Sequence, residues 1–115
     1  MSKLYSLHPL VLRPGVKAEE FETFVKEVWP SYTPFPGWKP HILKGDRGDR
    51  EGKYLVLMEI ESVEARNRFY PRPGEPSDEL KQFAEAHPES TKILEKFQTL
   101  VDGLGVLYTG YVEIV

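Results

Sequence analysis

The order of the apolar repeats along this chain is the feature that most restricts its fold. Alternation of apolar and polar residues predicts strands over residues 4–13, 38–44, 53–61 and 105–115. Apolar residues at helical spacing lie between these segments, over about 17–29 and across 63–101. Strand, helix, strand, strand, helix, strand is the order of a split βαβ sheet. We therefore expect an α+β fold, a ferredoxin-like βαββαβ antiparallel sheet with its helices on one face.

Two prolines fall inside the predicted strands. Pro9 has no N–H to donate to a ladder, and such residues are normally confined to edges or bulges. We therefore expect a bulge near Pro9, which leaves open the face to which the neighbouring His8 points. Pro40 lies in the second predicted strand and indicates that this strand is at an edge of the sheet.

The helical region 63–101 is predicted to consist of several pieces. Ser62 and Ser77 precede two of them and are suitable N-caps, because their hydroxyls can accept from backbone N–H groups. The sequence PRPGEP over 71–76 must be a loop. Pro88 can open a further helix at its first position, where its missing N–H costs nothing.

Both faces of the predicted sheet are apolar. The face that the helices can cover carries Leu10, Leu12, Val56, Met58, Ile60, Val112 and Ile114. The opposite face carries Tyr5, Leu7, Val11, Leu55, Leu57, Leu107 and Tyr111. No helix is left to cover this second set, which is larger than the apolar patches that monomers usually expose. We expect a homodimer through this sheet face; the alternative is that loops cover some of these residues.

Composition excludes several classes of function. The chain has 115 residues, which predicts one domain over 1–115. Its net charge is -3, with acids and bases interspersed, which argues against nucleic acid as a partner. It has no cysteine and hence no disulfide or thiolate site. No apolar run approaches the ~20 residues needed to span a bilayer, and the first ten residues lack a signal-peptide pattern. We expect a cytoplasmic protein with no membrane partner.

His8 and His87 are the candidate catalytic residues. His8 shares a predicted strand face with Leu10 and Leu12, where it could be a general base in a pocket. The alternative is a hydrogen-bonded core histidine. His87 closes an apolar helical stripe and is expected at a helix start, which favours the neutral imidazole that ligates metals or accepts protons. The alternative is a residue that only caps or packs at a helix junction.

A pocket for a small apolar molecule would have apolar and aromatic walls. The candidate ligand-binding residues are Trp38, Tyr54, Met58, Phe83 and Tyr108. Aromatic residues at strand spacing are equally typical of a plain core. The sequence offers no metal-ligand set, phosphate-binding glycine loop or nucleophile elbow, so we expect no metal and no cofactor. Glu59 lies on the apolar outer face and needs a partner or a place at the rim, while His41 is expected at the surface or interface.

Several segments resemble a known superfamily. Arg13-Pro14-Gly15 between a strand and a Phe-bearing helix resembles the opening of the dimeric α+β-barrel proteins. Pro36-Gly37-Trp38, the run from Tyr54 to Ser62, Ala65 and Phe69 are similar to the middle of antibiotic-biosynthesis-monooxygenase-like domains. The resemblance implies a dimeric α+β barrel with a pocket in each subunit, between the sheet and the second helical region. The superfamily includes cofactor-free oxygenases of aromatic substrates and haem-degrading enzymes.

One local similarity concerns haem. Phe83-Ala84-Glu85-Ala86-His87 is similar to the segment that carries the iron-ligating histidine in the haem-degrading members, and His8 stands where they have a pocket asparagine. Ser77 stands in place of their pocket tryptophan, and Pro88 interrupts their continuous helix. Both departures argue against haem degradation.

Three functions therefore stay open. The first is a monooxygenase-like enzyme that acts on a small apolar or aromatic molecule. The second is a non-catalytic small-ligand-binding or assembly protein. The third is a haem-binding or haem-degrading protein, with His87 as the candidate ligand.

Overall fold

The sheet is antiparallel and has the strand order expected of a ferredoxin-like fold. The computed structural model describes residues 2–103 and 108–115. Its strands are β1 (Leu4–Leu12), β2 (Trp38–Lys44), β3 (Tyr54–Ile60), β4 (Val101–Asp102) and β5 (Thr109–Val112). The order across the sheet is β2-β3-β1-β4, and β5 pairs with the same edge of β1 as β4. The predicted α+β class is thereby confirmed.

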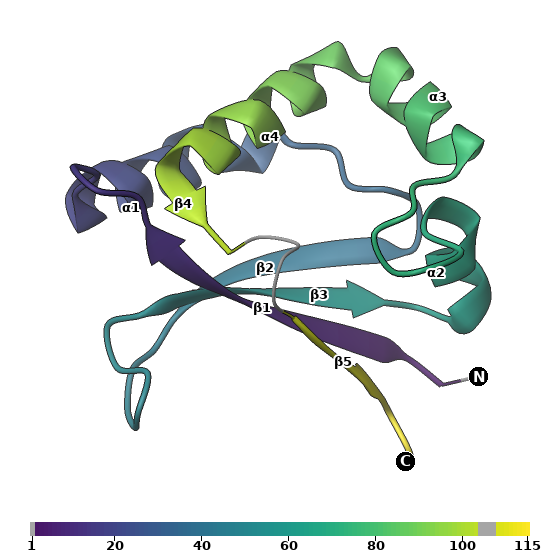
Figure 1. Ribbon diagram of the computed structural model, residues 1–115, viewed down its shortest axis with the longest axis horizontal. Coiled ribbons are helices and arrows are strands. Elements are labelled where there is room, and N and C mark those ends of the chain that lie inside the picture. The colour runs from purple at the N-terminus through teal and green to yellow at the C-terminus, as the bar shows by residue number, and fades with distance from the viewer. Residues whose placement is uncertain (1, 104–107) are drawn as a thin grey trace.

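The helices lie on one side of this sheet. Their bounds are α1 (Ala18–Glu27), α2 (Val63–Phe69), α3 (Asp78–Ala86) and α4 (Pro88–Leu100), and a short 3-10 helix covers Trp29–Ser31. Figure 1 shows α1, α3 and α4 above the strands and α2 at one end of the sheet. In the part of the chain that the structure describes, no helix combines the length and the apolar character needed to cross a membrane.

The predicted helix starts are confirmed by their hydrogen bonds. Ser62 Oγ accepts from the N–H of Ala65 at 3.1 Å, and Ser77 Oγ accepts from the N–H of Leu80 at 3.2 Å. Pro88 occupies the first turn of α4. These caps satisfy N–H groups that have no partner inside the helix, so each start is fixed by a local interaction.

The core is densest where α1 and α4 lie over β1 and β3. Phe21 of α1 and Phe97 of α4 are among the largest fully buried side chains, and their ring centroids are 5.8 Å apart. Strand residues Leu10, Tyr54 and Val56 belong to the same cluster. A second, smaller cluster of Leu4, Ile60 and Ala65 lies at the α2 end of the sheet.

The bulge predicted near Pro9 is absent. β1 pairs with β3 residue for residue, from Leu4 opposite Ile60 to Leu10 opposite Tyr54. The carbonyl oxygen of Pro9 points to the other edge, where a Cβ placed on Gly103 would lie 2.7 Å from it. Because the N and C=O of one strand residue face the same edge, the missing N–H of Pro9 faces away from β3 and breaks no bond of that ladder. Pro40 lies in β2, the predicted edge strand.

The last predicted strand, 105–115, is represented by β5 alone, and β4 precedes it at 101–102, where the sequence predicted the end of a helix. β4 pairs with residues 11 and 12 of β1, and β5 pairs with residues 4 to 7. The segment between β4 and β5 therefore has more residues than the stretch of β1 between their pairing partners. Leu107, expected on the outer face, lies outside the described residues. Val112 and Ile114 were expected beneath helices, but they are 55% and 91% exposed. The reason is that Val112 is the last residue of β5, a strand that pairs only with β1, and Ile114 lies beyond its end.

Replacement of Phe97 by alanine is expected to lower the free energy of unfolding by about 3–5 kcal/mol. The ring is 1% exposed and lies against Phe21, Phe24 and Trp29, which cannot collapse into the space that it leaves. Urea unfolding measures the change, with Val63→Ala at a 42% exposed helix position as the control. Equal losses in the two variants would contradict this description of the core.

Candidate functional site

The helix-facing side of β1 carries a hydrogen-bonded serine–histidine pair. Ser6 and His8 are two residues apart and so share one face of the strand. Ser6 Oγ lies 2.8 Å from His8 Nε2. The ring of Tyr108, which comes from the segment before β5, stacks on the imidazole with centroids 5.0 Å apart and an angle of 21°. The structure thus brings together two of the predicted site residues, His8 and Tyr108.

The imidazole of His8 is half-buried, and its surroundings favour the neutral form. Burial lowers the pKa of His8 from its ordinary value of 6.5, because the charged ring loses hydration. Its Nδ1 is buried without a hydrogen-bond partner among residues 2–103 and 108–115. At neutral pH this histidine is therefore an uncharged ring that can accept a proton.

The sheet is open beside this pair. Gly110 of β5 is opposite Ser6 in the register, and a Cβ placed on Gly110 would meet no atom of residues 2–103 and 108–115 within 4 Å. On the other side of Ser6, the paired residue is Met58, which is half-buried. The pair thus lies at the border between the packed core and an open strip over β5, with thioether and aromatic groups beside it.

His87 is positioned by a different set of contacts. It lies at the junction of α3 and α4, where it precedes the first residue of α4; the sequence predicted such a position at a helix start. Its Nδ1 lies 2.9 Å from the carbonyl oxygen of Phe83, and its ring stacks on that of Phe83 with centroids 4.0 Å apart. A carbonyl oxygen can only accept, so Nδ1 carries the proton and Nε2 keeps a lone pair. The contacts of His87 and those of His8 share no residue.

An aromatic cluster connects Phe83 to Trp38. Phe35 contacts the rings of Phe83 and Trp38, with centroids 5.2 and 5.6 Å away. Phe69 stacks on Phe35 at 4.7 Å and 10°. Trp38 is fixed further by its Nε1–H, which donates to the carbonyl oxygen of Ala65 at 2.9 Å. The sequence predicted Trp38 and Phe83 but not Phe35 and Phe69, whose loop and helix positions carry no signal of a shared cluster.

Tyr54 does not join this cluster. It faces α1, where its ring lies 4.8 Å from that of Phe21 and its hydroxyl donates to Glu22. Burial and the neighbouring Glu22 carboxylate raise the pKa of Tyr54 to about 12. In the register of β2 and β3, Tyr54 pairs with Lys44 and Trp38 pairs with Ile60, so Tyr54 and Trp38 stand at opposite ends of the two strands.

Glu59 finds the partners that its place on an apolar face requires. Lys3 Nζ lies 2.9 Å from one carboxylate oxygen, and His41 Nε2 lies 3.4 Å from the other. The Lys3 ammonium lowers the pKa of Glu59. The expected surface or interface position of His41 agrees with its side chain being 34% exposed.

Two of the depressions on the surface of the described residues are lined by neither of the candidate histidines. One of about 400 Å³ lies at the end of the sheet, lined by Lys3, Gly37, Trp38, Lys39, Glu59 and Glu61. The other, of about 170 Å³, lies between α1 and β2. Within residues 2–103 and 108–115, no group of three or more His, Cys, Asp or Glu side chains is placed to hold a metal ion.

Comparison with known proteins adds little to this geometry. No family model and no curated protein sequence matches the chain. A solved structure, that of the protein At3g17210 from Arabidopsis thaliana, aligns with 97% of this chain and 94% of its own, at 14% identity and a TM-score of 0.44.

The burial of His8 predicts a pH dependence of stability. The unfolded chain binds a proton at His8 more readily than the folded protein does. The contribution of the neutral His8 to the free energy of unfolding is therefore complete above about pH 6.5, and it is lost as the pH drops through the lower pKa of the folded protein. His8→Gln removes this contribution. Urea unfolding at several pH values is expected to give a shallower acid decline for the variant; an unchanged decline would show that His8 is not desolvated.

Proposed function

We propose that this protein is a homodimer that binds a small, flat apolar or aromatic molecule beside Ser6 and His8 and acts on it as a monooxygenase-like enzyme. The observation that carries the proposal is the hydrogen-bonded pair next to the open position over Gly110. A flat molecule in that strip would lie between Met58 and Tyr108, and its polar atoms would reach the pair. Such a mixture of apolar walls with a few polar groups is typical of small-molecule sites.

The chemistry assigned to His8 is that of a general base. Its ring is neutral at pH 7, because burial lowers its pKa, and one nitrogen is already within hydrogen-bond distance of a hydroxyl. Proton abstraction from an aromatic molecule with an acidic O–H or C–H leaves an electron-rich anion.

The oxidative part of the proposal is supported by the sequence resemblance to cofactor-free oxygenases. The deprotonated substrate reacts with dioxygen as the oxidant. For a methylene next to an aromatic carbonyl the balance is CH₂ + O₂ → C=O + H₂O, so both electron pairs come from the substrate. His8 takes up the first proton and returns it to the water that leaves. No external reductant is needed.

Haem is a weaker candidate. His87 has the tautomer of a ligating histidine, with Nδ1 bonded to the Phe83 carbonyl and Nε2 free to bind. A porphyrin needs a wide slot beside its ligand, but the ring of Phe83 covers one face of His87. The surroundings of His87 therefore do not fit the group.

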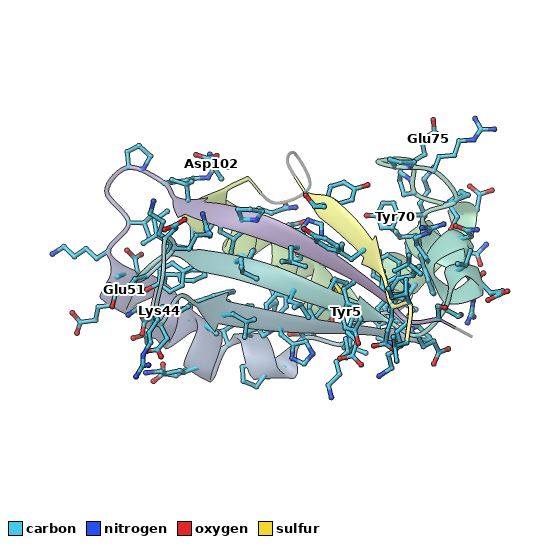
Figure 2. The ribbon with its side chains drawn as sticks, turned by 90° about the horizontal axis from the view of Figure 1, so that it is seen from below. Tyr5, Lys44, Glu51, Tyr70, Glu75 and Asp102 are labelled. Carbon is cyan, nitrogen blue, oxygen red and sulfur yellow. The ribbon has the colours of Figure 1, made fainter. Side chains whose placement is uncertain are left out.

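The dimer is proposed to form through the outer face of the sheet, with a second copy of the chain as the partner. Figure 2 views the molecule from this side, where the strands lie in front of the helices. Val11 and Tyr111 on this face are 66% and 55% exposed, and Leu7, Leu55 and Leu57 are half-buried. A two-fold axis would place this apolar set against itself.

Charge on the same face supports a second copy as the occupant. Lys3 and Glu59 neutralise one another at one end of the face, and Tyr5 donates to Glu113 nearby. The leucines are thus left as a continuous apolar centre with a polar margin, which is the usual anatomy of an interface between subunits.

Leu57→Glu is expected to convert the dimer to a single chain of 13.3 kDa, because it places a charge at the centre of the apolar face without a partner. Sedimentation equilibrium at micromolar concentration measures the mass. Val63→Glu puts the same charge at an exposed apolar position on α2 and should leave the dimer intact. A monomeric wild-type protein would contradict the proposed interface.

Gly110→Leu is expected to fill the open strip and to weaken the binding of 2-naphthol, a flat aromatic probe, at least about tenfold, or about 1.4 kcal/mol. The backbone of Gly110 is not in the left-handed region, and its Cβ would meet no atom of the described residues within 4 Å, so the variant should fold. Amide chemical shifts in NMR titrations give the affinity.

Thr109→Leu is the matched control for this titration, because it adds an apolar side chain to the neighbouring residue on the opposite face of β5. It should leave the affinity for 2-naphthol unchanged. Equal affinities in the wild type and both variants would place the probe elsewhere. Binding without any turnover of aromatic substrates in the presence of dioxygen would favour the non-catalytic alternative.

A further inference from the structure

The imidazole of His8 has one edge through which it can exchange a proton with a bound molecule. Its Nδ1 is buried, and the ring of Tyr108 stacks on one face. Nε2 is the remaining polar atom, and Ser6 Oγ lies 2.8 Å from it. A molecule that approaches Nε2 therefore meets the hydroxyl of Ser6 at the same place.

Ser6 itself stands next to the open strip. Its partner across β1 and β5 is Gly110, which has no side chain to cover it, and its partner across β1 and β3 is Met58, which carries no proton to donate. Ser6 and His8 are both half-buried, but of the two only Ser6 is paired with β5, opposite Gly110.

We propose that Ser6 is a second catalytic residue of this site, whose hydroxyl contacts the bound molecule and relays its proton to His8 Nε2. The inference rests on the proposed function and adds the path of the proton. A serine hydroxyl can donate and accept at the same time, which a relay requires. As the ligand O–H bond breaks, its proton goes to Ser6 Oγ, and the former hydroxyl proton of Ser6 passes to Nε2. The products are the ligand anion and the imidazolium of His8, and no oxidant is involved.

The relay also restricts the ligand and the tautomer of His8. Nε2 must be the bare nitrogen, so Nδ1 carries the proton in the resting protein. Because burial makes His8 a weaker base than an exposed histidine, its ligand must have an unusually acidic proton, such as that of a phenol or an enol. Aliphatic alcohols of the same size are excluded as substrates.

The test uses 2-naphthol, which becomes a much stronger acid when excited and emits at longer wavelength after it loses its proton. Bound to the wild-type protein and excited beyond the tryptophan absorption, it is expected to show naphtholate emission. Ser6→Ala should bind the probe within twofold of the wild type but lose most of this emission. Ser6→Thr keeps a hydroxyl and should restore it, while Ser31→Ala, at an exposed serine, should have no effect.

The outcomes separate the relay from the site on which it rests. Retained naphtholate emission in Ser6→Ala overturns the relay and leaves the binding site in place. No binding of 2-naphthol to the wild-type protein overturns both. A spectrum of ¹⁵N-labelled histidine gives an independent reading, because the relay requires a proton on Nδ1 of His8; a resting protein with the proton on Nε2 contradicts it.

Discussion

The pairing of β1 along both of its edges is the constraint on which the rest of this structure depends. On one edge it is paired with β3 without interruption, and on the other it meets β4 and then β5, with no described strand beside residues 8 to 10. Pro9 stands in that interval, where a residue without an N–H breaks no ladder bond. His8 lies in the same interval and Ser6 lies just before it, opposite Gly110 of β5, so the candidate site adjoins the break between β4 and β5.

The unequal cover of the sheet decides which parts of it are core. α1 and α4 bury the central strands with aromatic and aliphatic side chains, and Phe97 is the residue that joins them. β5 pairs only with β1 and lies at the edge of the sheet, where Val112 is exposed and the neighbouring His8 is half-buried. A histidine in the middle of the core would be out of reach of a ligand, and one fully in water would have an ordinary pKa. A half-buried histidine is partly desolvated and can still be reached by a ligand.

Much of this architecture could be predicted because it is determined by local signals. The bounds of β2, the caps at Ser62 and Ser77 and the edge position of Pro40 follow from alternation, hydroxyl capping and a missing donor. The absence of a bulge at Pro9 and the short strand β4 at 101–102 could not be predicted, because both depend on which edge of β1 a distant segment occupies. Ser6 was missed as a site residue because serine on a strand is a common residue, and only its distance to His8 distinguishes it.

Gly103 has a consequence for how this chain can vary. Its φ is +104°, a conformation that side-chain-bearing residues rarely adopt, and the carbonyl of Pro9 occupies the space where a Cβ would stand. The backbone conformation and the lack of space each exclude a side chain at Gly103. Removing one of these restrictions would still leave the other. Gly103 directly follows β4, so a side chain at this position would push the end of β4 away from the backbone of β1 at Pro9.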